Sequence, residues 1–224
     1  MNQELINYLA QYLTEKRFAI LNKIIQNRTR YLTVVLEDIY QSQNASAVLR
    51  SCDCFGIQDV HVIENRNKFD VNPKVALGSS KWLSIHSYKE GVNNTRDAIL
   101  NLKANGYRIV ATTPHDNDVH LEDFDLLDGK SALVFGTELE GISEEVKNNA
   151  DVFLKIPMYG FTESFNISVS AAIILHHLTL KLHESKINWQ LSANERDKLL
   201  TTWLGTSIKG SDLIIKEFYK QRNL

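Results

Sequence analysis

Short apolar runs that are typical of β-strands alternate along this 224-residue chain with segments of helical periodicity. The runs are rich in β-branched residues, and the segments between them repeat apolar residues every three or four positions. Strands are expected at 32–36, 60–63, 82–85, 107–112, 131–135 and 152–156, and helices at 44–55, 94–104, 143–149 and 166–184. This alternation predicts an α/β fold with an open, mostly parallel sheet, because parallel strands must be joined by long crossover connections.

Helical segments flank the alternating region on both sides. Residues 3–26 carry apolar side chains at helical spacing, and residues 192–222 are expected to form an amphipathic helix or pair, with breaks at Gly205 and Gly210. A chain of this length fits one domain with appendages. We therefore expect an N-terminal helical extension, an α/β domain and a C-terminal helical extension, over 1–30, 31–186 and 187–224.

The composition is that of an ordinary globular protein, with 43% hydrophobic and 23% charged residues. No run of about eighteen apolar residues exists, so no membrane span is expected. The N-terminus lacks the pattern of a signal peptide, and a cytoplasmic location is expected. Cys52 and Cys54 lie two positions apart in a helical pattern, which turns their side chains away from each other and favours neither a disulfide nor a shared metal.

The net charge of −2 conceals an uneven distribution. Residues 1–30 carry five Lys and Arg against two acids, and residues 192–224 carry six against four. By difference, the stretch 31–191 has fourteen basic and twenty-one acidic residues, a net of −7. Basic ends on an acidic body suit contact with a polyanion through the arms, although ordinary solvated helix faces have the same composition.

A glycine pair follows the expected strand at 131–135. The spacing of Gly136 and Gly141 matches the start of a phosphate-binding loop, but Ile142 stands where that loop needs a lysine. A nucleotide triphosphatase is therefore excluded, and the missing G-x-G-x-x-G leaves a conventional dinucleotide site or Rossmann-type methyl-donor site without support. What remains is a tight turn whose backbone groups can bind a neutral heterocycle such as adenine, or else a plain strand-to-helix connection.

A second turn follows the last expected strand. Pro157 ends this strand, Gly160 permits a sharp turn, and Ser164 and Asn166 stand at the start of the long apolar helix. Either polar residue could simply cap that helix. Together with Met158 they also compose a small polar floor under an apolar wall, which suits adenosine bearing a sulfonium side chain.

A third polar feature is the helix that follows the first strand. Asn44 is expected to cap this helix, and Arg50 lies six positions further on, within the sequence Ala-Val-Leu-Arg-Ser-Cys. An arginine in apolar surroundings needs an anion or a buried partner. A salt bridge to a neighbouring acid is the simplest alternative to a functional role.

Taken together and in this order, segments 44–50, 135–141 and 156–166 resemble the three motifs of the SpoU/TrmH branch of the SPOUT RNA 2′-O-methyltransferases. The resemblance extends over about 32–181. It implies a C-terminal deep trefoil knot within the α/β domain, a homodimer, and S-adenosylmethionine bound in the loops of the last two motifs. Nothing in composition or periodicity indicates the knot.

The resemblance also assigns roles to individual residues. It implies a catalytic Arg50, assisted by Asn44, Glu138, Ser164 and Asn166. It implies contacts with the methyl donor from Thr112, Gly136, Thr137, Glu138, Gly141, Ile156, Met158, Gly160, Ser164, Phe165 and Asn166. Phe165 stands where relatives often have leucine, and Gln43 where close relatives often have histidine.

The implied reaction is S-adenosylmethionine-dependent methylation of a ribose 2′-oxygen in RNA. The three motifs contain no well-placed carboxylate or histidine base, so we expect Arg50 to bind the substrate phosphate and stabilise the developing alkoxide. Helical extensions at both ends resemble those of the TrmH group, which modifies the D-loop guanosine of tRNA (position 18). The predicted RNA contacts are Lys16, Arg17, Lys23, Arg28, Arg30 and Lys81.

Other functions stay open at this point. The chain could methylate another nucleotide of tRNA or rRNA, or be a non-catalytic RNA-binding relative. A different class is a small-molecule α/β enzyme that uses Glu138 with His115 or His120. The acidic loop from His115 to Asp118 could hold a metal, but such loops are usually solvated, and no metal is expected.

Overall fold

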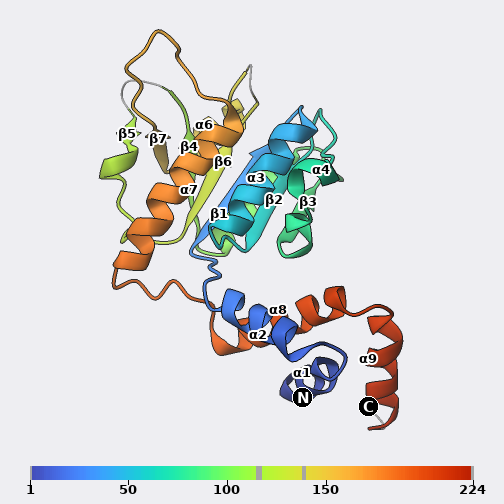
Figure 1. The fold of residues 1–224 in the computed structure, drawn as a ribbon. Helices are drawn as coiled ribbons and strands as arrows, with labels where there is room; N and C mark the ends of the chain where they lie inside the picture. Colours follow the sequence, from blue (N-terminus) through green and yellow to red (C-terminus); the bar gives the residue numbers. More distant parts are fainter. Residues whose placement is uncertain (1, 115–117, 138–139, 223–224) are drawn as a thin grey trace. The chain divides into compact units, whose positions relative to one another are not determined.

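A computed structural model of the protein describes residues 2–114, 118–137 and 140–222. It divides into two compact units (Figure 1). The smaller unit combines both ends of the chain, Met1–Thr29 and Gln190–Leu224, and the larger unit is Arg30–Trp189.

Within the described residues of the larger unit, seven strands form one sheet in the order β3-β2-β1-β6-β4-β7-β5. Every pair of neighbours is parallel, which confirms the predicted α/β fold. The sequence missed β5, because a strand of two residues has no measurable period. The strands are β1 (Leu32–Glu37), β2 (Asp59–Ile63), β3 (Ser84–Tyr88), β4 (Arg108–Thr112), β5 (Val119–His120), β6 (Ser131–Phe135) and β7 (Val152–Lys155).

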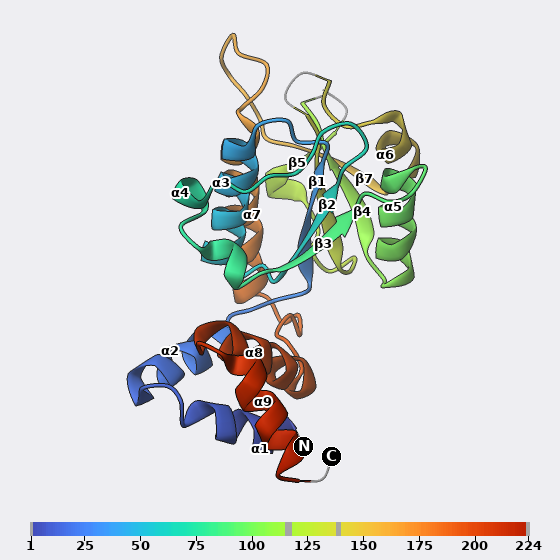
Figure 2. The ribbon, with the colours of Figure 1, turned by 90° about the vertical axis from the view of Figure 1, so that its right-hand side faces the viewer.

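Helices cover both faces of this sheet (Figure 2). On one side, α3 (Ser42–Cys54) and α7 (Ile167–Glu184) lie next to each other, with the short α4 (Pro73–Ala76) beside α3. On the other side lie α5 (Asn94–Ala104) and α6 (Glu144–Asn149). Two 3-10 turns, Ser79–Lys81 and Leu121–Asp123, complete the connections.

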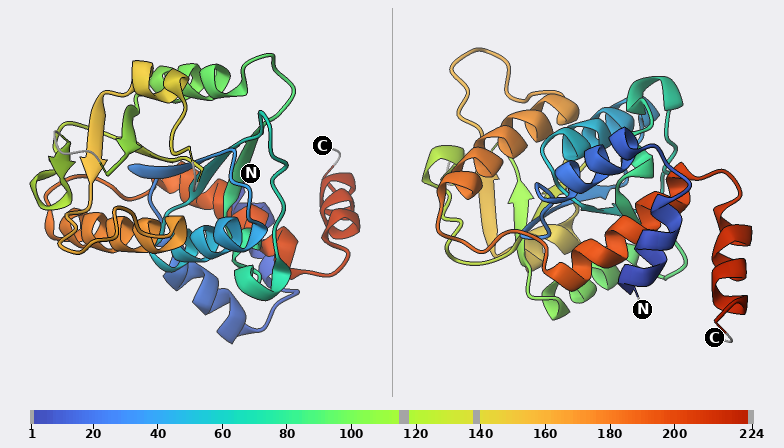
Figure 3. Two further views of the ribbon diagram at one scale, coloured as in Figure 1. Left: turned by 90° about the horizontal axis from the view of Figure 1, so that it is seen from above. Right: turned by 60° about the horizontal axis from the view of Figure 1, so that its bottom comes forward.

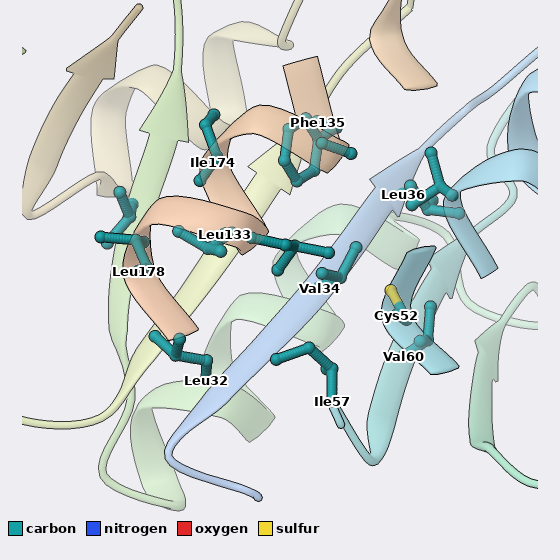
Figure 4. Close-up of a cluster of buried hydrophobic side chains, with 14 of the residues drawn as sticks. Leu32, Val34, Leu36, Cys52, Ile57, Val60, Leu133, Phe135, Ile174 and Leu178 are labelled. Atoms are coloured by element: carbon teal, nitrogen blue, oxygen red, sulfur yellow. The ribbon is translucent and has the colours of Figure 1, made fainter. Parts of the chain in front are cut away.

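The central strands are buried on both faces, as their continuous apolar runs require. Leu32, Val34 and Leu36 of β1 pack toward α3 and α7, together with Leu133 of β6 and its neighbours (Figure 4). The alternate residue Val35 belongs to a second core under α5 and α6. The sheet is therefore held between two apolar layers.

The start of α3 differs from the sequence expectation. The helix begins at Ser42, and Gln41 is its N-cap without any capping hydrogen bond from its side chain. The prediction that Asn44 caps this helix is therefore wrong. The Asn44 side chain is engaged elsewhere, because its amide donates to Gln41 Oε1 (3.2 Å) and its oxygen accepts from Asn166 (3.1 Å).

The end of α3 follows the prediction. Gly56 comes directly after the C-cap Phe55 and has a φ of 77°, a left-handed conformation that favours glycine. Cys52 is buried in the core while Cys54 is exposed, and neither forms a disulfide. Helical spacing had predicted this divergence of the two side chains.

The smaller unit consists of α1 (Asn2–Ala10), α2 (Glu15–Ile25), α8 (Ala193–Ser207) and α9 (Ser211–Lys220), with α1 packed beside α8 (Figure 3). Trp203 and Phe218 are almost completely buried. Gly210, with a φ of 73°, precedes α9, but the predicted break at Gly205 is wrong because α8 continues through it. A helical glycine costs only about 1 kcal/mol, and the buried side chains of Trp203 and Leu204 hold this turn in place. No helix in the described part of the chain combines the length and apolarity needed to cross a bilayer.

The two-sided core gives a stability prediction. Leu133 lies in the middle of β6 and is 0% exposed, so Leu133→Ala should lower the free energy of unfolding by about 2–5 kcal/mol. Leu100, on the solvent side of α5, is 58% exposed and supplies the matched control; Leu100→Ala should change stability by less than about 0.5 kcal/mol. Urea unfolding followed by circular dichroism measures both, and equal losses would contradict this description of the core.

Candidate active site

A cavity of about 710 Å³ lies at the carboxyl ends of the central strands. Thr112 of β4, Phe135 of β6 and Leu154 of β7 contribute to its wall, and the loops that follow these strands supply most of the rest. In parallel sheets these ends gather at one edge, where ligands bind. The remaining lining residues are Gln41, Asn44, Thr113, Pro114, Gly136, Thr137, Glu140, Gly141, Ile142, Lys147, Ile156, Met158, Glu163, Ser164, Phe165, Asn166, Ile167, Ser170 and Ile174.

The loop after β6 forms one wall. Thr137 N–H donates to the Gly141 carbonyl (2.8 Å), and Gly141 N–H donates back to the Thr137 carbonyl (3.1 Å). A Cβ at Gly136 would lie 2.1 Å from the Gly141 oxygen, so no other residue fits there without displacing the loop. Gly141 itself has a φ of 69°. These two requirements explain the glycine pair that the sequence analysis singled out.

The loop after β7 forms the opposite wall. Ile156, Met158, Ser164 and Phe165 line the cavity. Asn166 is the N-cap of α7, and its side-chain oxygen accepts from the Ser168 N–H (2.9 Å). Of the two polar residues expected at this helix start, Asn166 is therefore the cap.

Asn166 also links the third motif to the first. Its amide donates to the side-chain oxygen of Asn44 (3.1 Å), and Asn44 is 8% exposed at the cavity end of α3. These two residues are 122 positions apart in the sequence. The cavity therefore brings Asn44, Ser164 and Asn166 together, as a shared site would require.

Arg50 lies elsewhere. It is exposed on α3 and does not contribute to the lining of the cavity. It is six positions from Asn44 along the helix, a rise of about 9 Å along the helix axis. Within the described residues no carboxylate pairs with Arg50, so the alternative of a local salt bridge is not realised there.

Other residues were also predicted to contact the methyl donor. Thr112 lines the cavity and donates its hydroxyl to the Val134 carbonyl (2.8 Å). Gly160 lies in the same loop as Met158 but outside the lining. Glu138 lies outside the described residues, as does His115.

Several lining residues were missed by sequence reasoning. Thr113 and Pro114 follow the predicted strand at 107–112 directly, so its carboxyl end was the signal for them. Ile167, Ser170 and Ile174 recur at helical spacing along the first turns of α7, which places them on one face. Glu140 and Glu163 lie inside the motif segments 135–141 and 156–166 but were not singled out, and Lys147 carried no local signal.

The cavity mouth carries one charged contact with a clear electrostatic effect. Arg66, in the loop after β2, donates to Glu140 at 2.7 Å. This hydrogen bond and the charge of the guanidinium hold the pKa of Glu140 below its usual value. Both side chains are well exposed, so the pair orients Glu140 without contributing much to stability.

The predicted RNA contacts divide into accessible and inaccessible residues. Lys16, Lys23 and Lys81 are exposed, and Arg17 is partly exposed. Arg30 is bound to Asp59 at 2.8 Å. Arg28 is only 2% exposed, with its guanidinium 5.1 Å from the centre of the Trp203 ring, and this burial does not fit the predicted contact with a phosphate.

The small-molecule alternative gains no support from the cavity. His120 is exposed on β5 and does not line the cavity. Over residues 2–114, 118–137 and 140–222, no cluster of His, Cys, Asp and Glu side chains is arranged to hold a metal ion.

Solved structures of known proteins share this architecture. The crystal structure of the Aquifex aeolicus TrmH/SpoU tRNA modifying enzyme superposes with a TM-score of 0.77 at 31% identity, covering 87% of this chain and 98% of that one. The SpoU methyltransferase AviRb from Streptomyces viridochromogenes, solved with the cofactor AdoMet, has the same fold, with a TM-score of 0.60 at 24% identity over 73% of this chain and 65% of that one.

Sequence comparisons lead to the same group. A tRNA (guanosine(18)-2′-O)-methyltransferase from Borreliella burgdorferi is 44% identical over 93% of this chain and 94% of that protein. The enzyme of the same name from Aquifex aeolicus is 32% identical over 86% of this chain and 91% of that protein. The model of the SpoU rRNA Methylase family matches residues 31–176. The resemblance read from the three motifs is confirmed, and the chain belongs to the SpoU methylase family.

Proposed function

We propose that this protein methylates the 2′-oxygen of the D-loop guanosine of tRNA, at position 18, with S-adenosylmethionine as methyl donor. The observation that carries the proposal is the union of three sequence motifs around one cavity at the sheet edge. The function named for its relatives over more than nine-tenths of their length agrees with this site. Because its substrate is tRNA, we place the enzyme in the cytoplasm.

The cavity suits the proposed donor. Its volume of about 710 Å³ lies within the range of roughly 300–1,000 Å³ that drug-sized ligands occupy. Phe135, Ile156 and Met158 supply apolar wall, and Thr112 and Ser164 supply a few polar groups. S-adenosylmethionine brings an activated methyl group on a positively charged sulfur. In the proposal the loops after β6 and β7 hold it, and these loops form the trefoil knot typical of the family.

The catalytic arginine completes the site from a second copy of the chain. Arg50 is exposed on α3 and lies outside the cavity of its own chain, so in a homodimer it can reach RNA held at the partner's cavity. Its planar guanidinium binds the ribose-phosphate through paired hydrogen bonds and stabilises the negative charge on the 2′-oxygen while the hydroxyl proton passes to solvent water. Asn44 and Asn166 fix the junction of α3 and α7.

Substitution of Arg50 should affect turnover but not the affinity for the methyl donor. Arg50→Ala should lower turnover at least about 100-fold, because stabilisation of the developing oxyanion is lost. The Kd for S-adenosylmethionine should stay within about twofold, since Arg50 is not in the cavity wall. Arg50→Lys keeps the positive charge but removes the planar guanidinium. Near-normal turnover in that variant would exclude a role for paired hydrogen bonds from the guanidinium. Arg96→Ala, an exposed arginine of α5, is the control for loss of a surface charge.

RNA contact through the basic arms predicts a salt effect. Binding to tRNA should weaken steeply between low and moderate salt, whereas binding of the methyl donor should not. Replacing Lys16 and Lys23 together by alanine should reduce the slope of log Kd against log salt by about two, which is about one for each lost phosphate contact. Lys103→Ala, which removes a lysine paired with Asp151, should leave this slope unchanged. A salt-independent affinity would exclude a polyanionic substrate.

The product itself provides the direct test. Incubation with unmodified total tRNA and labelled donor, followed by mapping of the methylated nucleotide, should identify guanosine 18 of the D-loop. Methylation at another tRNA nucleotide, or of rRNA alone, would show that guanosine 18 of tRNA is not the substrate. Tight RNA binding without methyl transfer would instead identify a non-catalytic relative. A rise in melting temperature with S-adenosylmethionine checks donor binding separately.

A further inference from the structure

Two consecutive carboxylates lie at the carboxyl end of the central strand β1: Glu37 is its last residue, and Asp38 follows it. Glu37 is 2% exposed and Asp38 is 4% exposed, and neither lines the cavity. Buried carboxylates are retained only where hydrogen bonds replace their water. Their partners therefore show what these two residues hold.

Glu37 binds the end of the loop after β6. Ser143 N–H donates to Glu37 Oε2 (2.9 Å), and the Ser143 hydroxyl donates to Oε1 (2.7 Å). Ser143 follows Gly141 and Ile142, which both line the cavity, and it also caps α6. On its other side Glu37 Oε1 accepts the hydroxyl of Thr95 in α5 (2.7 Å).

Asp38 reaches the same loop by a longer route. It has a φ of 52°, and its Oδ1 accepts the backbone N–H groups of Asn65 (2.7 Å) and Arg66 (2.8 Å). Arg66 in turn pairs with Glu140 in the cavity wall. This second link runs through an exposed ion pair, so Glu37 is the stronger anchor.

We infer that Glu37 is a positioning residue for the methyl donor: its buried carboxylate holds Ser143, and through it the preceding residues Gly141 and Ile142, which line the cavity. This inference rests on the proposed function. Within the described residues, the loop closes on itself through Thr137 and Gly141, and Ile142 is buried in the core under α5 and α6. The bonds from Ser143 to Glu37 add a polar attachment at the carboxyl end of β1.

The role predicts a selective loss in Glu37→Gln. Glutamine keeps the size of the side chain but is neutral and has one acceptor oxygen in place of two, so the charge-assisted bonds from Ser143 and Thr95 are lost and their hydroxyls can at best accept from the new NH₂ group. The Kd for S-adenosylmethionine, measured by calorimetry, should rise about tenfold or more, as expected for a lost hydrogen bond to a charged group. Turnover at saturating donor should fall less than about threefold, because Glu37 does not touch the reacting groups.

Thr95→Val is the matched control. It removes another donor to the same carboxylate, but from α5, which does not line the cavity. It should lower the melting temperature and leave the Kd for the methyl donor within about twofold. If Thr95→Val and Glu37→Gln weaken donor binding equally, Glu37 serves general stability and the inference is overturned.

A variant on the loop side covers the case in which Glu37→Gln fails to fold. Ser143→Ala removes the hydroxyl bond to Glu37 and should also weaken donor binding relative to Thr95→Val. In the folded double variant, Ser143→Ala should add little to the effect of Glu37→Gln, because both act on one contact. Unchanged donor affinity in these variants would refute the positioning role. Failure of the wild-type protein to bind the donor would instead refute the proposed function.

Discussion

Burial of the central strands on both faces is the constraint on which the rest of this structure depends. β1 and β6 are mostly apolar and are buried along their whole length, so each needs a helical layer on both faces of the sheet. Helical crossovers make every described strand pair parallel, and parallel strands bring their carboxyl ends to one edge. The cavity lies at that edge, where the loops that follow the strands supply most of its lining.

This geometry brings together motifs that are far apart in the sequence. Asn44 follows β1 and Asn166 precedes α7, and their hydrogen bond spans 122 positions of sequence. The adjacent packing of α3 and α7 on one face of the sheet brings the two side chains together. The fold therefore creates the site from residues that each also have a local task, such as the capping of α7 by Asn166.

Local patterns predicted what local interactions determine. The bounds of α5 and β6, the cap at Ser143 and the left-handed Gly56 all follow from neighbouring residues, and the structure confirms them. Two of the errors concern long-range contacts. Asn44 was expected to cap its helix, but Asn166 engages it. Arg28 was expected to contact RNA, but it is buried with its guanidinium over the ring of Trp203. The sequence suggested the cavity-lining motifs, whereas the role of Glu37 required knowing that Ser143 lies above it.

The positions of Glu37 and Arg50 imply a division of labour. Glu37 is buried outside the cavity lining, and Arg50 is exposed on α3. In the proposed reaction, Glu37 sets the shape of the donor site and Arg50 acts on the acceptor. A cavity formed within one chain can bind the donor before any RNA arrives. If the arginine comes from the partner chain, methyl transfer additionally requires a correctly assembled dimer. Donor affinity and turnover are then set by different contacts, one inside the sheet domain and one between copies of it.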